Sequence, residues 1–281
     1  MKKLFLLFLA AIAVVACKRD KATQTVATKA DSLAIDSVLA VPPDTVQSGD
    51  TTAVAPPPTV DELFADFIYS YTTNRRFQLE RTDFPLKEYI DGKLQGSVEK
   101  SQWRFDRLYY KHSLHIIILD SERKVAKLPS VKPDTVKVEW LLFKKQRCRQ
   151  YLFVRERGVW RMNRINIFPI SHHADAGFLE FYEKFASDSV FQSHHLAETL
   201  DFTTYDEDNH FQKIEGLIER DQWPAFHPDL PADDIFSIDY GMGLRNKNVR
   251  VISVRGNSNS MSSMFKFVRK KGGWTLVKFE N

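Results

Sequence analysis

The sequence holds only two cysteines among 281 residues, Cys17 and Cys148. A framework of several disulfides, which stabilises many small exported domains, is therefore excluded. The apolar run near the start, residues 4–16, is too short for a membrane-spanning helix, which needs roughly 20 apolar residues. Hydrophobic residues nevertheless make up 43% of the chain, so its folded part has enough apolar material for real cores.

Aromatic residues are also missing from a long stretch, between Phe8 and Phe64. A segment without them buries too little surface to offset the entropy lost on ordering. Residues 18–58, which carry five prolines among Ser, Thr and Ala, are therefore predicted to be a disordered tether. About 40 residues of flexible coil span some 35 Å at roughly 5–6 Å × √n. Such a tether holds a folded body away from a membrane.

The first 17 residues read MKKLFLLFLAAIAVVAC. Two lysines followed by a short apolar core are typical of a signal peptide. Small residues directly before Cys17 make the stretch resemble a bacterial lipobox. That resemblance implies a lipoprotein signal peptide over residues 1–17 and an acylated Cys17, bearing diacylglycerol and a palmitate-like chain, as the first mature residue. The alternative is an ordinary secretory signal with an incidental cysteine.

The remaining chain repeats itself at an offset of 114 residues. Aromatic positions with helical spacing recur, namely Phe64, Phe67 and Tyr71 as Phe178, Phe181 and Phe185. Shorter motifs recur in the same order, namely Phe77-Gln78 as Phe191-Gln192, and FVRERGVW as FVRKKGGW. Trp103 matches Trp223 at an offset of 120, which indicates a short insertion. The pattern predicts a duplicated domain of about 110 residues, with copies over residues 59–170 and 171–281.

Each copy has helical patterns first and alternating strand patterns afterwards. Thr59 and Glu62 predict a capping box before the first helix. Further helical segments are expected over residues 77–84, 189–200 and 211–220. Strands are expected over residues 113–120, 135–143, 146–156, 160–168, 234–240, 248–256, 262–270 and 274–280, with Arg157-Gly158 and Lys271-Gly272-Gly273 as hairpin turns. The fold class is α+β, with N-terminal helices packed on a curved antiparallel sheet in each copy.

This order resembles the cone-like nuclear transport factor 2-like superfamily, whereas cystatin-like α+β folds share the same outline. Together with the lipobox and the tether, it resembles a family of uncharacterised envelope lipoproteins of Bacteroidales. The resemblance implies attachment to the bacterial outer membrane through lipid on Cys17. Surface lipoproteins of that group place a basic residue and then two acids after the cysteine. Here Arg19 interrupts the pattern, so periplasm-facing and surface-exposed locations both stay open.

Charge is divided unequally between the copies. Residues 61–170 hold 22 basic and 14 acidic residues, a net charge of +8, whereas residues 171–281 hold 12 and 17, a net charge of −5. Guanidinium groups bind phosphate and carboxylate with paired hydrogen bonds. An anion-binding face is therefore predicted at Arg147, Arg149, Arg155 and Arg157. Its expected partners are an anionic glycan, lipid or envelope protein, and nucleic acid is excluded outside the cytoplasm. A solvated face balanced by the acidic second copy is the alternative.

Other groups with reactive side chains are weaker candidates for sites. His172-His173 and His194-His195, with Asp175, lack the spacing of a zinc site, so neither metal nor cofactor is expected. Cys148 is expected to be a core residue. Four tryptophans are expected to be core and Trp140 the freest to line a pocket. Acids paired with tyrosines would serve proton transfer in a cone, namely Asp91 or Asp106 with Tyr109 and Tyr110, and Asp239 with Tyr240.

These patterns contain no complete catalytic constellation. The predicted function is that of a lipid-anchored envelope protein that binds a ligand or partner without catalysing a reaction. One alternative is a small envelope enzyme with a buried acid in a cone pocket, and another is a structural component of an outer-membrane assembly. A deep polar pocket with a buried acid would favour the enzyme, whereas cones filled by Phe and Trp would argue against it.

Overall fold

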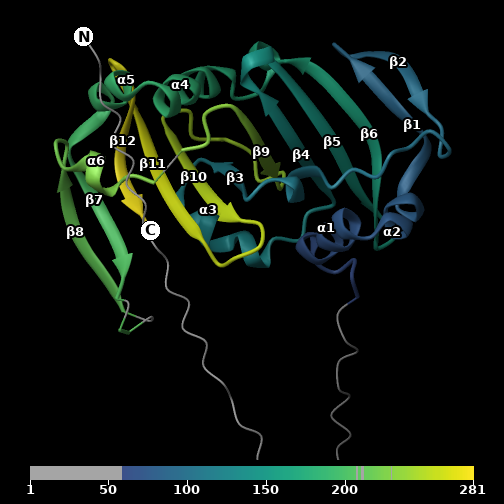
Figure 1. Ribbon diagram of the computed structural model, residues 1–281, viewed down its shortest axis with the longest axis horizontal. Coiled ribbons are helices and arrows are strands. Elements are labelled where there is room, and N and C mark those ends of the chain that lie inside the picture. Colours follow the sequence, from purple (N-terminus) through teal and green to yellow (C-terminus); the bar gives the residue numbers. More distant parts are fainter. Residues whose placement is uncertain (1–58, 207, 210–211, 229) are drawn as a thin grey trace, which may run out of the picture. The chain divides into compact units, whose positions relative to one another are not determined.

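The computed structural model describes residues 59–206, 208–209, 212–228 and 230–281. The predictions for the signal peptide, Cys17 and the tether therefore lie outside the described residues. Below, residues 59–170 are called the first half and residues 171–281 the second half. Each half begins with helices and continues with strands, as Figure 1 shows.

The elements of the first half alternate helices with six strands. They are α1 (Phe64–Thr73), α2 (Arg75–Glu80), β1 (Thr82–Ile90), β2 (Lys93–Val98), η1 (Leu108–Lys111), β3 (Leu114–Leu119), α3 (Glu122–Lys127), η2 (Leu128–Ser130), β4 (Thr135–Leu142), η3 (Phe143–Lys145), β5 (Arg147–Glu156) and β6 (Val159–Pro169).

The second half has the same order of strands. Its elements are η4 (Ile170–His172), which begins at the boundary, α4 (Ala176–Ser187), α5 (Ser189–His194), β7 (Leu196–Tyr205), β8 (Lys213–Glu219), α6 (Trp223–Phe226), β9 (Asp234–Asp239), β10 (Val249–Gly256), β11 (Ser262–Lys270) and β12 (Gly273–Glu280).

All twelve strands form one curved, unclosed sheet, in the order β2-β1-β6-β5-β4-β9-β3-β10-β11-β12-β7-β8. The fold is thus α+β, as predicted. The two halves exchange one strand each at the centre. Strand β9 of the second half pairs with β4 of the first, and β3 of the first half pairs with β10 of the second. Between them β3 and β9 run parallel, with Ile116 opposite Ser237.

The strand registers recur between the halves. Phe153 lies opposite Met162 in β5–β6, and 114 residues later Phe267 lies opposite Leu276 in β11–β12. The register also recurs in the exchanged strands β3 and β9, whose equivalent residues are 120 positions apart. Ile118 of β3 lies opposite Ile252 of β10, and Ile238 of β9 lies opposite Val138 of β4. Strand β9 therefore lies beside β4, where β3 would lie if the first half kept its own strand. Likewise, β3 lies beside β10, where β9 would lie.

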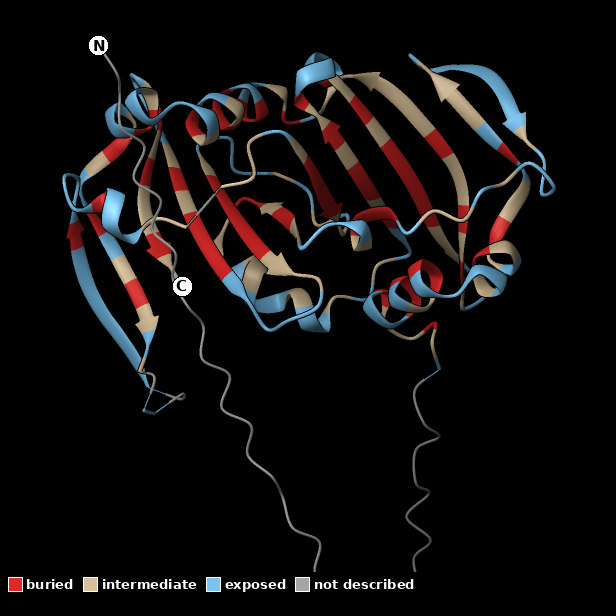
Figure 2. Cartoon of the chain, in the orientation of Figure 1, coloured by how far each residue is buried: buried red, intermediate tan, exposed pale blue. Residues whose placement is uncertain are grey.

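Two apolar clusters lie on opposite faces of this sheet. The α1 cluster gathers around Phe67 and Trp160, and the α4 cluster around Phe181 and Trp274. Neighbouring side chains of β3 divide between them, because successive strand residues point to opposite faces. Ile117 belongs to the α1 cluster and Ile116 to the α4 cluster. Both faces of the central strands are therefore buried, which explains the apolar run 116–119 of β3 (Figure 2).

A buried glutamine ties helix to loop in both halves. The Gln78 side chain donates to the carbonyl of Tyr71 at 3.0 Å and accepts from the Trp103 indole at 2.9 Å. In the second half, Gln192 donates to Phe185 at 3.0 Å and accepts from Trp223 at 3.0 Å. The recurrence of these residues in the sequence thus reflects one repeated hydrogen-bond arrangement.

Some local predictions were wrong. The predicted capping box does not form, because α1 begins only at Phe64 and Thr59 precedes a turn closed by its own carbonyl and the N–H of Glu62. Helices α2 and α5 end early, and β1 and β7 begin within the ranges expected to be helical. In the range 211–220, of which residues 212–220 are described, β8 replaces the expected helix because it pairs with β7 along its length. Tertiary pairing overrides local helical preference there.

Candidate functional site

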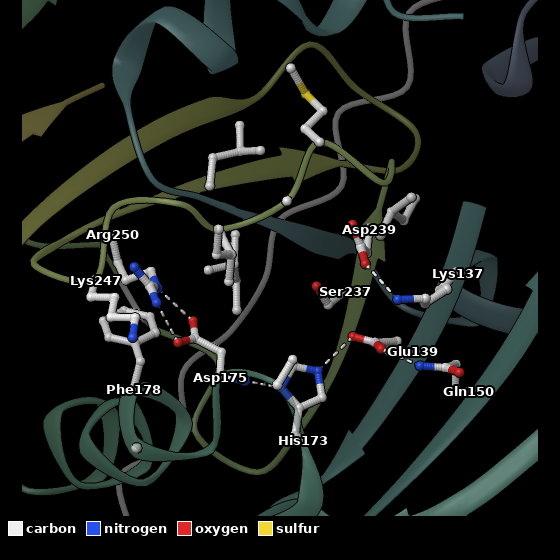
Figure 3. A pocket seen from close by; sticks show the side chains of 18 of the residues that line it. Lys137, Glu139, Gln150, His173, Asp175, Phe178, Ser237, Asp239, Lys247 and Arg250 are labelled. Carbon is white, nitrogen blue, oxygen red and sulfur yellow. Dashed lines mark hydrogen bonds and ion pairs between the residues drawn. The ribbon is translucent and has the colours of Figure 1, made fainter. Parts of the chain in front are cut away.

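A pocket of about 730 Å³ lies between the halves, where α4 begins. Its walls come from β4 and β5 of the first half, and from β9, the start of α4 and the segment after β9 in the second half. Figure 3 shows Asp175 and Arg250 on one side of it, with Glu139 and Gln150 on the other. The site thus combines residues from both halves.

The segment after β9 explains why this space is open. At the 120-residue offset, residues 242–247 correspond to α3 (Glu122–Lys127) of the first half, which packs on β3 and β10. In the second half Gly241 and Gly243 adopt φ values of +71° and +68°. That left-handed conformation suits glycine and interrupts a helix. A loop therefore stands where a helix would cover the strands.

Glu139 is the most deeply placed acid of the pocket wall, with 4% of its surface exposed. Its Oε1 accepts from the amide of Gln150 at 2.7 Å, and Gln150 in turn accepts from Asn166 at 2.8 Å. Its Oε2 lies 3.1 Å from Nε2 of His173. A buried carboxylate needs such partners, because an unpaired charge in the interior is strongly destabilising.

His173 has both ring nitrogens engaged. Nδ1 accepts from the backbone N–H of Asp175 at 3.0 Å, so the proton of the neutral ring lies on Nε2 and is donated to Glu139. Burial lowers the pKa of His173, but the hydrogen bond and charge of Glu139 outweigh it and leave the pKa raised. Either nitrogen would have to give up a hydrogen bond before it could act as a base on a ligand.

Asp175 and Arg250 form a second buried pair. The guanidinium donates to both carboxylate oxygens, at 2.7 and 2.8 Å, and both side chains are nearly inaccessible. Arg250 also donates to the carbonyls of Asn246 and Val249, at 2.6 and 2.7 Å. One arginine therefore joins the start of α4 to the loop that borders the pocket. The Asp175 carboxylate makes no capping bond to α4.

The equivalent acid of the first half is Asp61, 114 residues earlier and 7% exposed. It binds a different arginine, Arg81, through two bonds of 2.8 and 2.9 Å, and also accepts from the backbone N–H of Trp160. The recurrence of these acids at the common offset was a signal in the sequence that the predictions did not use. Nothing in the sequence pattern pointed to Glu139, whose counterpart is Ser253.

The pocket rim carries further charges. Lys137 pairs with Asp239 at 3.2 Å, with both side chains partly exposed. Lys247 and Arg269 also line the pocket, and neither forms an ion pair with an acid in the described part of the chain. The guanidinium of Arg269 lies 5.9 Å from the ring centre of Trp274. The rim is therefore cationic on the side of the second half.

The predicted anion-binding arginines are spread along β5 and its turn. Arg147 lies 3.3 Å from Asp91 and Arg149 lies 3.0 Å from Glu88, so both are matched by acids near the β1–β2 turn. Arg155 and Arg157 lie at the far end of β5 and in its turn. They are eight residues beyond Arg147 and Arg149, or about 26 Å along the chain at roughly 3.3 Å per residue. The structure thus separates the four arginines into two pairs.

The acids and tyrosines expected for proton transfer are not brought together. Asp91 lies in the β1–β2 turn, and Asp106 accepts from Tyr151 at 3.1 Å. Asp239 lines the pocket, but burial raises the pKa of its neighbour Tyr240 to about 12, and that ring packs on Phe64 in the α1 cluster.

The paired histidines diverge. His172 is exposed while His173 binds Glu139, and His195 stacks on Phe191 while His194 is exposed. Among the described residues, no group of three or more His, Cys, Asp or Glu side chains is placed to hold a metal ion.

The core predictions for cysteine and tryptophan are confirmed. Cys148 is fully buried in the α4 cluster, and burial raises the pKa of its thiol. Three tryptophans are buried, and Trp103 packs half-buried against the α1 cluster. Trp140 stacks on Phe236 at 5.3 Å and points away from the pocket, on the face opposite to Glu139.

The aromatic side chains of α1 and α4 pack on aromatic residues from the strands of their own half. Phe64 and Phe67 pack against Phe153 and Trp160 in the first half, with ring centres between 5.0 and 6.1 Å apart. The pocket borders the α4 cluster, because Phe178 and Trp274 of that cluster line it. Among the described residues, no helix is long and apolar enough to cross a membrane.

Comparison with known proteins places these features in a family. The family model described as a domain of unknown function (DUF4348) matches residues 44–281. The chain is similar to a crystal structure of an NTF2-like protein from Bacteroides fragilis, with 34% sequence identity and a TM-score of 0.70. That match covers 80% of this chain and 98% of the other. Among curated proteins, none matches this chain.

Proposed function

Because the chain belongs to the DUF4348 family and has an NTF2-like fold, we propose that it is a lipid-anchored envelope protein that binds a small ligand between its halves. The observation that carries this proposal is the pocket of about 730 Å³, walled by both halves. Pockets of roughly 300–1,000 Å³ hold small ligands in proteins. The buried acids Glu139 and Asp175 bind other side chains, so their carboxylates have partners in the absence of a ligand.

A side chain that fills the pocket tests the proposal. Gly177 lines it at the start of α4, and a Cβ built there meets no atom within 4 Å. The variant Gly177→Phe should therefore fold, and it places an aromatic ring at the pocket wall. Gly96→Phe is the matched control, because Gly96 is equally open but lies on the exposed strand β2.

The assay is a thermal-shift screen of the chain from Lys18 onward against glycans, lipids and amphipathic acids. A ligand at 100 times its Kd stabilises the folded state by about 2.7 kcal/mol. Compounds that stabilise the parent chain and Gly96→Phe should no longer stabilise Gly177→Phe. If Gly177→Phe keeps every stabilising effect, the pocket is not the binding site.

The envelope location is proposed from the sequence of residues 1–17, and a second experiment tests it. Cys17→Ala should leave the protein unacylated and release it from the membrane fraction. The matched variant Cys148→Ala keeps the anchor and should remain in the membrane fraction. Continued membrane association of Cys17→Ala would contradict lipid anchoring.

We also propose that the halves arose by duplication. Support comes from strand registers that recur at offsets of 114 and 120 residues, and from the repeated Gln–Trp hydrogen bond. The exchanged strands then make the halves mutually dependent, because each half completes its sheet with a strand of the other.

An enzymatic role is the second candidate, and the two buried acids of the pocket favour it. Glu139 and His173 are the residues that would move a proton. Both nitrogens of His173 are engaged, however, which argues for a structural role. Any turnover found for a pocket ligand should vanish in Glu139→Gln while binding persists. Binding without turnover in the parent chain would exclude the enzyme.

A further inference from the structure

The charges of the pocket do not cancel. Four cations line it, Lys137, Lys247, Arg250 and Arg269, against three acids, Glu139, Asp175 and Asp239. Two of the cations are neutralised within the protein, since Lys137 pairs with Asp239 and Arg250 with Asp175. The third acid, Glu139, is satisfied by His173 and Gln150. Lys247 and Arg269 are left without an acidic partner among the described residues.

These two cations lie on the same side of the pocket. The backbone N–H of Arg269 donates to the carbonyl of Asn248 at 2.8 Å, so the residue after Lys247 is tied to Arg269. The next pair along the strands is Val249 opposite Val268. Figure 3 shows Lys247 on the side of Phe178 and Arg250, away from Glu139. Neighbouring backbone positions thus carry two cationic side chains to one side of the pocket, where they attract an anion.

Apolar side chains line the rest of the space. Met242, Leu244, Ile118 and Phe168 are half-buried and face the pocket, so they keep contact surface that other parts of the chain do not cover. Small-molecule sites commonly combine such an apolar lining with a few polar groups that fix orientation. A ligand suited to these walls needs an apolar body as well as a charged end.

We infer that the ligand is a small amphipathic anion, with a carboxylate or phosphate group held by Lys247 and Arg269 and an apolar body against Met242, Leu244, Ile118 and Phe168. This inference rests on the proposed function of the pocket. Arginine binds carboxylate or phosphate through paired hydrogen bonds, and lysine adds a point charge. The anion would lie at the rim, next to the Trp274 ring that the Arg269 guanidinium contacts.

The test compares four probes by isothermal titration against the chain from Lys18 onward. Decanoate and decyl phosphate carry both parts of the expected ligand, decanol carries only the apolar body, and acetate carries only the charge. We expect decanoate or decyl phosphate to bind at least tenfold more tightly than decanol and acetate. The stronger of the two decides between a carboxylate and a phosphate. Equal binding of decanol and both decyl anions would overturn the inference.

Charge removal gives the second arm. The double variant Lys247→Ala with Arg269→Ala should lose at least tenfold in affinity for the anionic probe. The matched control is Arg245→Ala with Lys270→Ala, which removes the same charges from the same two segments but from residues that do not line the pocket. An equal loss in both double variants would mean a general charge effect and would overturn the assignment.

Failure of this inference is distinguishable from failure of the proposed function. If a neutral probe binds and Gly177→Phe abolishes its binding, the pocket is a binding site for a different class of ligand. If Gly177→Phe leaves the binding of every probe unchanged, the pocket is not the binding site. Neither result depends on an unfolded variant, provided that thermal unfolding of each variant is cooperative.

Discussion

The buried pair of Asp175 and Arg250 should show strong energetic coupling. Replacing Arg250 by Met leaves the Asp175 carboxylate, of which 6% is exposed, without its two guanidinium bonds. Loss of one partner of a buried ion pair costs about 3–5 kcal/mol. Asp175→Asn keeps the shape but has only one acceptor oxygen, so one bond is lost and the buried Arg250 charge is uncompensated, which we also expect to cost about 3–5 kcal/mol. The double variant should cost less than the sum, because it buries no uncompensated carboxylate.

The assay is a double-mutant cycle measured by equilibrium urea unfolding at pH 7. Residues in direct contact show coupling energies of roughly 0.5–3 kcal/mol, and we expect this pair at the upper end. The control cycle uses Lys144 and Asp233, which are 2.8 Å apart but mostly exposed, and should show no measurable coupling. Additive effects of Arg250→Met and Asp175→Asn, or equal coupling in the control, would refute burial as the source of the energy.

Three further predictions concern stability. Burial alone would raise the pKa of Glu122, but hydrogen bonds from Lys266 and Lys278 outweigh burial and hold that pKa below its usual 4.5. The stability that Glu122 contributes is therefore present above pH 4.5, and it is lost as the pH falls through the lowered pKa. The difference in free energy of unfolding between the parent and Glu122→Gln, measured with urea, should therefore fall from its value at neutral pH to about zero between pH 5 and pH 2. A difference that stays constant would contradict a stabilising role of the ion pairs. Gly177→Ala should raise the free energy of unfolding by up to about 1 kcal/mol, because glycine is a poor helix former and the added Cβ meets no atom. A loss of stability would show that the added methyl group is not tolerated. Gln192→Leu should cost about 1–3 kcal/mol by leaving the buried Trp223 indole N–H unpaired, and an unchanged urea midpoint would show that the bond is dispensable.

Local patterns in the sequence predicted much of the sheet. The predicted turns at Arg157-Gly158 and Lys271-Gly272-Gly273 lie where the structure connects β5 to β6 and β11 to β12. Strand alternation is set by neighbours along the chain, so it can be read from the sequence. Helix ends were less predictable. Strands β1 and β7 continue where helical spacing was expected, because pairing with β6 and β12 stabilises an extended chain.

The pocket was beyond the reach of sequence patterns. Glu139 occupies a strand position that reads as solvent-facing, because alternation along β4 distinguishes faces but not what covers each face. It is buried because the start of α4 and the loop after β9 lie over it. Two halves must meet before that acid, His173 and Asp175 become neighbours.

By itself, the sequence determined the α+β class, the places of eight of the twelve strands and the recurring positions of the aromatic residues, since these follow from periodicity and turn chemistry within each half. Only the tertiary structure decided that β3 and β9 are exchanged. Both strands carry apolar side chains on both faces, and either could hydrogen-bond to β4 or β10 by local chemistry alone. The exchange is a long-range pairing between the halves, which no local pattern specifies, and the pocket likewise forms only where residues of both halves meet.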